Sequence, residues 1–153
     1  MSVIAELKRE LGTLRTEVQH LRERMRLMWN ALQTTTSGGI RQTVLTFPGV
    51  LGIGRNNLRI YNETGQDWTI TKVKLSCDTT PGGQAIIVDV HKEGTTIFTD
   101  PAHRPAIEAG AYEGETVLID TPLWADGEYV QAYLDQVGST ALGADVVVHI
   151  IHN

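Results

Sequence analysis

The sequence predicts an N-terminal α-helical parallel coiled coil followed by an all-β sandwich of jelly-roll type. Three observations support this fold class: a heptad repeat over 1–33, a Thr-, Ser- and Gly-rich stretch after it, and alternation with period 2 from residue 43 onward. The 153 residues are 41% hydrophobic and 20% charged, which excludes a disordered chain. We therefore divide the chain into an oligomerisation stalk at 1–33, a flexible hinge at 34–42 and a sandwich head at 43–153.

Apolar residues of the first segment recur at alternating spacings of three and four residues, without a break. This repeat averages 3.5 residues, the period that keeps one narrow seam of a helix facing a partner helix. An isolated helix of this length is marginal in water, so partner helices are expected. The nine seam residues are Ile4, Leu7, Leu11, Leu14, Val18, Leu21, Met25, Met28 and Leu32.

Charged residues beside the seam favour a parallel arrangement of identical chains. Between parallel neighbours Glu10 meets Arg15 and Glu17 meets Arg22, and both inter-chain ion pairs are attractive. The seam leaves dimer and trimer open, because it lacks the regular residue choices and the buried asparagine that specify a dimer. The alternative to a coiled coil is an amphipathic helix that packs on its own domain, which usually has a broader apolar stripe.

Short runs of alternating apolar and polar residues follow Arg41, and turn sequences such as Glu93-Gly94 and Asp126-Gly127 separate them. About eight short strands in about 110 residues, with no helical period, indicate a sandwich or jelly roll. The expected strands are Thr43–Phe47, Leu58–Asn62, Trp68–Cys77, Ala85–Lys92, Thr95–Phe98, Thr116–Asp120, Glu128–Asp135 and Ala144–His152.

No group of residues points to an enzyme, so we predict no catalytic residue, no metal site and no cofactor. The string GIGRNN at 52–57 resembles the start of a dinucleotide fingerprint, but it leads into a strand and is interpreted as a loop. The single cysteine, Cys77, excludes a disulfide framework and a multi-cysteine zinc site. His149 and His152 lie three positions apart in a strand and point to opposite faces, so they cannot chelate one ion.

The charge is distributed unevenly, with +2 on 1–33 and −7 on the remaining residues. The acidic part lacks a basic stripe, so nucleic acid is not an expected partner. No run of about 18 apolar residues exists, so membrane insertion is not expected. A secretory signal is absent and cysteine is scarce, which predicts synthesis and folding in a reducing cytoplasm.

Two aromatic residues in or beside predicted loops, Tyr112 and Trp124, are the candidate ligand contacts. Exposed rings on a β-sandwich can stack on sugars or anchor an interface. The alternative is that Trp124 closes the end of the core and Tyr112 packs between subunits.

The strand and turn pattern of the β part resembles the β-sandwich modules of tailed-bacteriophage virion proteins, common in minor tail and fibre proteins of actinobacteriophages. The segments that carry this resemblance are LRIYNETGQDWTITKVKLS at 58–76, VDVHKEGTTIFTD at 88–100, RPAIEAG at 104–110, WADGEYVQAYLDQVGST at 124–140 and GADVVVHI at 143–150. The resemblance implies a helical stalk, a hinge and a β head, in an assembly that is usually a homotrimer. It carries over no binding residue.

From these observations we expect a non-enzymatic, trimeric structural protein of a phage virion. As a tail-tip component or short fibre, it would present its sandwiches to the host surface or to other virion proteins. A glycan of the host-cell surface is a further candidate partner. The first alternative is a capsid decoration or head-fibre protein, and the second is a sugar-binding, lectin-like module that is not viral.

Overall fold

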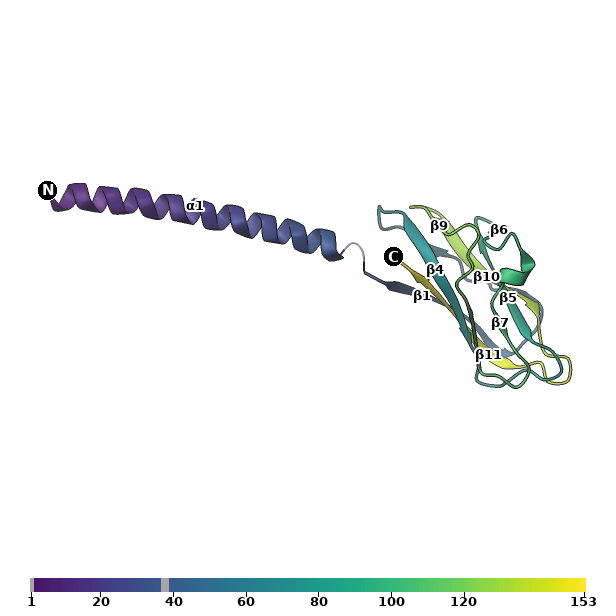
Figure 1. Cartoon of the computed structure of the whole chain (residues 1–153). Coiled ribbons are helices and arrows are strands. Elements are labelled where there is room, and N and C mark those ends of the chain that lie inside the picture. Colours follow the sequence, from purple (N-terminus) through teal and green to yellow (C-terminus); the bar gives the residue numbers. More distant parts are fainter. Residues whose placement is uncertain (1, 37–38) are drawn as a thin grey trace. The chain divides into compact units, whose positions relative to one another are not determined.

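The computed structural model describes the backbone of residues 2–36 and 39–153 and the side chains of 2–28 and 39–153. The chain forms two compact units, Met1–Gly39 and Ile40–Asn153. The first unit is helical and the second is built from β-strands (Figure 1).

The described residues of the first unit form one helix, α1 (Val3–Thr36). Ser2 begins it, because the Ser2 hydroxyl accepts a hydrogen bond from the Ala5 amide at 3.3 Å. The predicted fold class is corrected here, since a single helix stands where a parallel coiled coil was expected. A heptad repeat specifies an apolar stripe on one helix, whereas a coiled coil needs a second helix, and the described residues supply none against this stripe.

The helix ends later than the composition predicts. Residues 34–36 of the predicted hinge are helical, and 41–42 belong to the first strand, while 37 and 38 lie outside the described residues. Threonine is a modest helix former, but adding a residue to an existing helix costs little compared with nucleating one.

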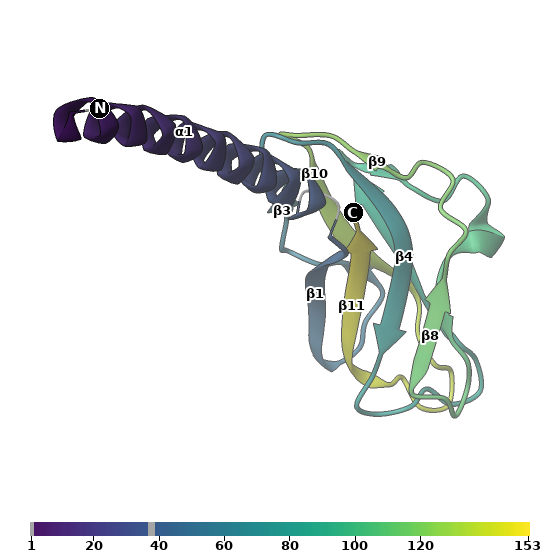
Figure 2. The same cartoon turned by 60° about the vertical axis from the view of Figure 1, so that its left-hand side comes forward.

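The second unit is an all-β sandwich of two antiparallel sheets, as the alternation predicts (Figure 1). In the first sheet the order is β1-β11-β4-β8, and β9 pairs with β4 (Figure 2). Its strands are β1 (Arg41–Val50), β4 (Trp68–Ser76), β8 (Glu113–Thr116), β9 (Leu123–Trp124) and β11 (Ala144–His152).

The second sheet has the order β2-β10-β5-β6, with β3 paired to β10 and β7 paired to β5. A short 3₁₀ helix, Pro101–His103, lies between β6 and β7. The strands are β2 (Gly54–Arg55), β3 (Ile60–Tyr61), β5 (Ile86–Lys92), β6 (Thr95–Thr96), β7 (Ala106–Ile107) and β10 (Tyr129–Gln136).

Several short strands differ from the prediction. The strand expected at 116–120 is wrong, since β8 occupies Glu113–Thr116, and the predicted loop at 52–57 contains β2. The position of β8 follows from close packing, because a β-carbon on Gly114 would lie 1.7 Å from the Ala106 carbonyl oxygen. Only glycine allows β8 to pass β7 at this distance.

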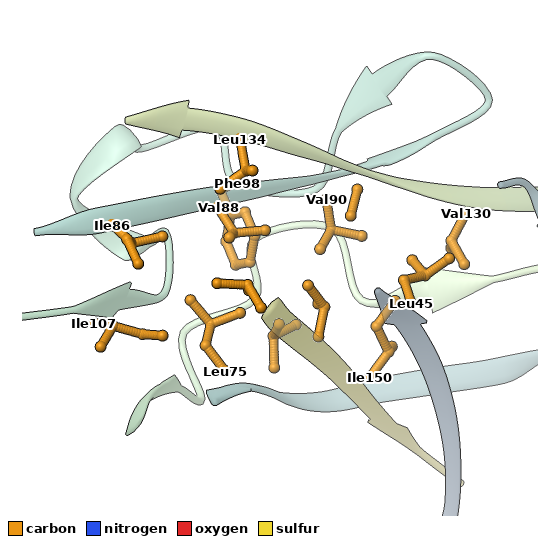
Figure 3. Close-up of a cluster of buried hydrophobic side chains, with 14 of the residues drawn as sticks. Leu45, Leu75, Ile86, Val88, Val90, Phe98, Ile107, Val130, Leu134 and Ile150 are labelled. Carbon is orange, nitrogen blue, oxygen red and sulfur yellow. The ribbon is translucent and has the colours of Figure 1, made fainter. Parts of the chain in front are cut away.

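Apolar side chains from both sheets fill the space between them (Figure 3). Val88, Val90 and Leu134 from the second sheet point toward Leu75 and Ile150 from the first, and all five are buried. Each side chain of this kind stabilises the fold by about 1.5–3 kcal/mol when fully buried. The inward positions are thus used by the core, and the outward positions of both sheets are available for function.

Candidate functional site

A row of apolar side chains along α1 lies open to solvent. We call it the apolar row, and its described members are Ile4, Leu7, Leu11, Leu14, Val18, Leu21, Met25 and Met28, each between 42% and 67% exposed. The side chain of Leu32, the last predicted seam residue, lies outside the described residues. Contiguous apolar surface in contact with water marks an interaction site or an aggregation hazard.

The charged residues beside the apolar row are not engaged within the chain. In the described part of α1 the ion pairs are Arg9 with Glu6, and Arg26 with Glu23 at 2.8 Å. Glu10, Arg15, Glu17 and Arg22 make no ion pair among the described residues. Their predicted inter-chain pairs stay a prediction.

A polar cluster lies on the outer face of the second sheet. The buried Asp89 carboxylate accepts hydrogen bonds from Thr96 at 2.6 Å and His91 at 3.2 Å, and it pairs with Arg104 at 3.1 Å. Arg104 also pairs with Asp135 at 2.9 Å, and burial raises the pKa of the Asp135 carboxyl. Both carboxylates contact donors, and through them the cluster fastens residue 104 to β5 and β10.

A second cluster surrounds His152 at the end of the first sheet. Its imidazole ring stacks on Trp68 at 4.1 Å and lies within hydrogen-bond distance of the Thr43 hydroxyl at 3.1 Å. Burial, with the charge of Arg41, lowers the pKa of His152, and its Nδ1 is buried without a partner. His149 instead reaches Gln42 on the outer face, which confirms that the two histidines point apart.

The two aromatic ligand candidates have different surroundings. Trp124 is completely buried, and its indole N–H donates to the Glu128 carbonyl at 2.9 Å, so the prediction that it contacts a ligand is wrong. Pairing of Trp124 with Trp68 between β9 and β4 brings the ring into the core. Tyr112 is 61% exposed, and its contact with a ligand stays a prediction.

The thiol of the single cysteine lies inside the sandwich unit. Cys77 is buried, and burial together with the nearby Asp78 carboxylate raises the pKa of the thiol, which keeps it protonated and unreactive. No group of three or more His, Cys, Asp and Glu side chains in the described part of the chain could hold a metal ion. Among those same residues, no helix is long and apolar enough to cross a membrane.

A groove opens at the edge of the sandwich, and the sequence analysis missed it. It has a volume of about 520 Å³ and lies between 46–48 of β1 and the segment 55–58. Arg55 lines the groove, and the guanidinium of Arg59 lies 4.7 Å from the ring centroid of Tyr129. The available signal was two arginines close together in an otherwise acidic domain, one in the predicted loop at 52–57 and the other in the strand expected at 58–62.

Comparisons with known proteins give weak likenesses only. No protein-family model matches the chain, and no curated protein matches it. The capsid of Ralstonia phage GP4 is 12% identical, covers 75% of this chain and 84% of its own, and has a TM-score of 0.45. The capsid of Helicobacter pylori bacteriophage KHP30 is 12% identical, covering 74% of this chain and 86% of its own at a TM-score of 0.43.

A third similar solved structure is not a phage protein. The Drosophila NLP-core, whose structure is described in terms of pentamer formation and histone binding, is 12% identical and has a TM-score of 0.40. It covers 73% of this chain and 97% of its own. The weak structural neighbours thus include phage capsid proteins, but likenesses at these scores assign neither a family nor a function.

Proposed function

We propose that the protein is a self-associating structural protein of a tailed-phage virion, without enzymatic activity. Three copies join along the apolar row of α1 and present their sandwiches at a tail tip or as a short fibre. The observation that carries self-association is the exposure of the eight described members of the apolar row.

Association along this row is energetically reasonable. Covering the exposed part of each of these side chains stabilises a complex by about 1 kcal/mol, roughly half the value for full burial. The sum over the row is comparable to the cost of association, about 4–15 kcal/mol. Hollows of about 380 Å³ beside Leu7 and about 340 Å³ beside Val18 can receive side chains from a neighbouring helix.

The number of copies and the virion setting rest on the resemblance of the strand and turn pattern to phage tail and fibre modules. Three sandwiches held together act at high local concentration, so weak individual contacts give firm attachment. The same arrangement suits binding to a host surface or to neighbouring virion proteins.

The test of self-association places charge in the apolar row. In Leu14→Asp with Leu21→Asp, two acidic groups enter the row, and we expect sedimentation equilibrium to change from trimer to monomer at micromolar concentration. The matched control is Thr13→Asp with His20→Asp, which adds the same charges at the same spacing outside the row and should leave trimers. A monomeric wild-type protein, or a trimeric row variant, contradicts the proposal.

The virion setting has its own test. Antibody labelling of intact particles in electron micrographs should place the protein at the tail tip or along short fibres. Label on the head would overturn the tail assignment, and absence of the protein from purified particles would overturn the virion proposal as a whole.

A further inference from the structure

The basic side chains of the sandwich unit differ in whether they have a carboxylate partner. The unit carries seven basic and fourteen acidic residues. Its lysines and Arg104 all lie within 4.0 Å of a carboxylate oxygen. Among the described residues of this unit, the basic side chains without such a partner are Arg41, Arg55 and Arg59. Two of these three guanidinium groups therefore belong to one short segment beside the edge groove.

The wall of this groove is held rigidly by Asn56. Its amide N–H donates to the Ala132 carbonyl at 2.8 Å, and its side-chain oxygen accepts from the Leu58 amide at 2.6 Å. Its side-chain nitrogen donates to the Thr46 carbonyl, and its own carbonyl accepts from the buried Gln131 side chain. A groove anchored on so many sides is preorganised, so a ligand would not have to order it.

An exposed aromatic ring continues the surface beyond the groove. Tyr61 is 48% exposed and lies opposite Tyr129 in the register of β3 and β10, with 5.5 Å between the ring centroids. Arg55 lies opposite Tyr133 in the register of β2 and β10. Tyr129 and Tyr133 occupy alternate positions of β10 from the inward-facing Val130 and Leu134, so this edge presents its polar and aromatic groups away from the core.

We infer that the edge formed by Arg55, Arg59 and Tyr61 binds an acidic polysaccharide of the host-cell surface. Guanidinium groups match the planar geometry of carboxylate and phosphodiester groups, and an aromatic face packs against the C–H face of a sugar ring. The inference extends the proposed function by naming a ligand class, and it rests on that function only for the host-surface setting.

Sparse negative charge fits this edge better than the dense charge of nucleic acid. Nucleic-acid binding normally needs a stripe of cations, because affinity comes from neutralising several phosphates together. This edge offers two guanidiniums without a carboxylate partner on a unit of net charge −7, which would repel a dense polyanion. A polysaccharide with one anionic group per few sugars meets both guanidiniums and avoids most of that repulsion.

The test measures binding of the full chain by calorimetry to four probes: a uronic-acid oligosaccharide, an oligosaccharide linked by phosphodiesters, a neutral glucan and single-stranded DNA. The wild-type protein should bind at least one acidic oligomer, which also identifies the anionic group, and should bind the glucan much more weakly. Arg55→Gln with Arg59→Gln should lower the association constant about tenfold, as expected for lost charge-assisted hydrogen bonds.

The matched control is Lys72→Gln with Lys74→Gln, which removes the same charge from the outer face of the other sheet and should change affinity less than about twofold. Tyr61→Leu should weaken binding while leaving its salt dependence unchanged, since the ring carries no charge. Equal losses in the two charge variants, equal binding of the glucan, tighter binding of DNA, or no binding of either acidic oligomer would overturn the inference.

Sedimentation of the same variants separates this inference from the proposed function. Arg55→Gln with Arg59→Gln should still form trimers, because neither residue belongs to the apolar row. The monomeric Leu14→Asp with Leu21→Asp protein should retain the affinity of each single site for a short acidic oligomer. Trimers without oligomer binding would refute the ligand assignment alone, whereas monomers with binding would refute self-association alone.

Discussion

Replacing Arg104 by methionine should weaken the sandwich substantially. Its guanidinium joins Asp89 and Asp135 at 3.1 and 2.9 Å, and the Asp89 side chain is only 3% exposed. Breaking a buried ion pair costs about 3–5 kcal/mol. Asp89 keeps its bonds to Thr96 and His91, and Asp135 is partly solvated, so we expect a loss of about 2–3 kcal/mol. For a unit of this size that corresponds to a Tm lower by about 8–12 °C.

Urea unfolding followed by tryptophan fluorescence measures this loss, because Trp68 and Trp124 report on the sandwich. Without Arg104, the charge of Asp89 and burial both raise the pKa of Asp135. The folded variant then takes up a proton at a higher pH than the unfolded chain, so its deficit should shrink between pH 7 and pH 5. Lys72→Met, which breaks a solvated pair at 3.2 Å, is the control and should cost less than about 1 kcal/mol. A loss in the Arg104 variant no larger than in this control would refute the reasoning.

Three further predictions concern single positions in the sandwich. Gly114→Ala should destabilise by more than about 2 kcal/mol in urea, because its β-carbon would meet the Ala106 carbonyl, whereas Gly52→Ala has open space and should cost less than about 1 kcal/mol. The pKa of His152 is lowered in the folded state, so stability should fall as pH drops below about 6.5, and His152→Phe should flatten that fall in urea titrations at pH 7 and pH 5. Cys77 should react slowly with a thiol reagent in buffer and rapidly in urea, and equally fast reaction in both would contradict its burial.

The longer strands could be predicted because their inward positions repeat every second residue. The expected strand Ala144–His152 has the bounds of β11, the one expected at 68–77 ends one residue after β4, and the one expected at 128–135 is shifted by one residue from β10. The two-residue strands β2, β7 and β9 were missed, since two residues carry no period. Their pairing is set by β4, β5 and β10, which lie elsewhere in the sequence.

The candidate surfaces also differ in whether they depend on local spacing or on pairing between distant segments. The apolar row is visible in the sequence because spacing along one helix is a local property. The coiled coil was wrong because a second helix is not encoded in the spacing of the first. Trp124 was misjudged because turn residues around it indicate a loop but do not reveal its pairing with Trp68. The binding role inferred for Arg55 and Arg59 could not be predicted from the sequence, because it depends on the pairing of β2 and β3 with β10.

The place of β11 in the first sheet has a consequence for biosynthesis. The strand made last in this unit lies between β1, made first, and β4, rather than at a margin. The first sheet can therefore close only after residues 144–152 have left the ribosome. Until then no strand connects β1 to β4. Contacts between such distant parts of a chain form slowly, while α1 is complete much earlier in translation. In the assembly proposed above, the helices of nascent copies on one polysome therefore meet before any sandwich is finished.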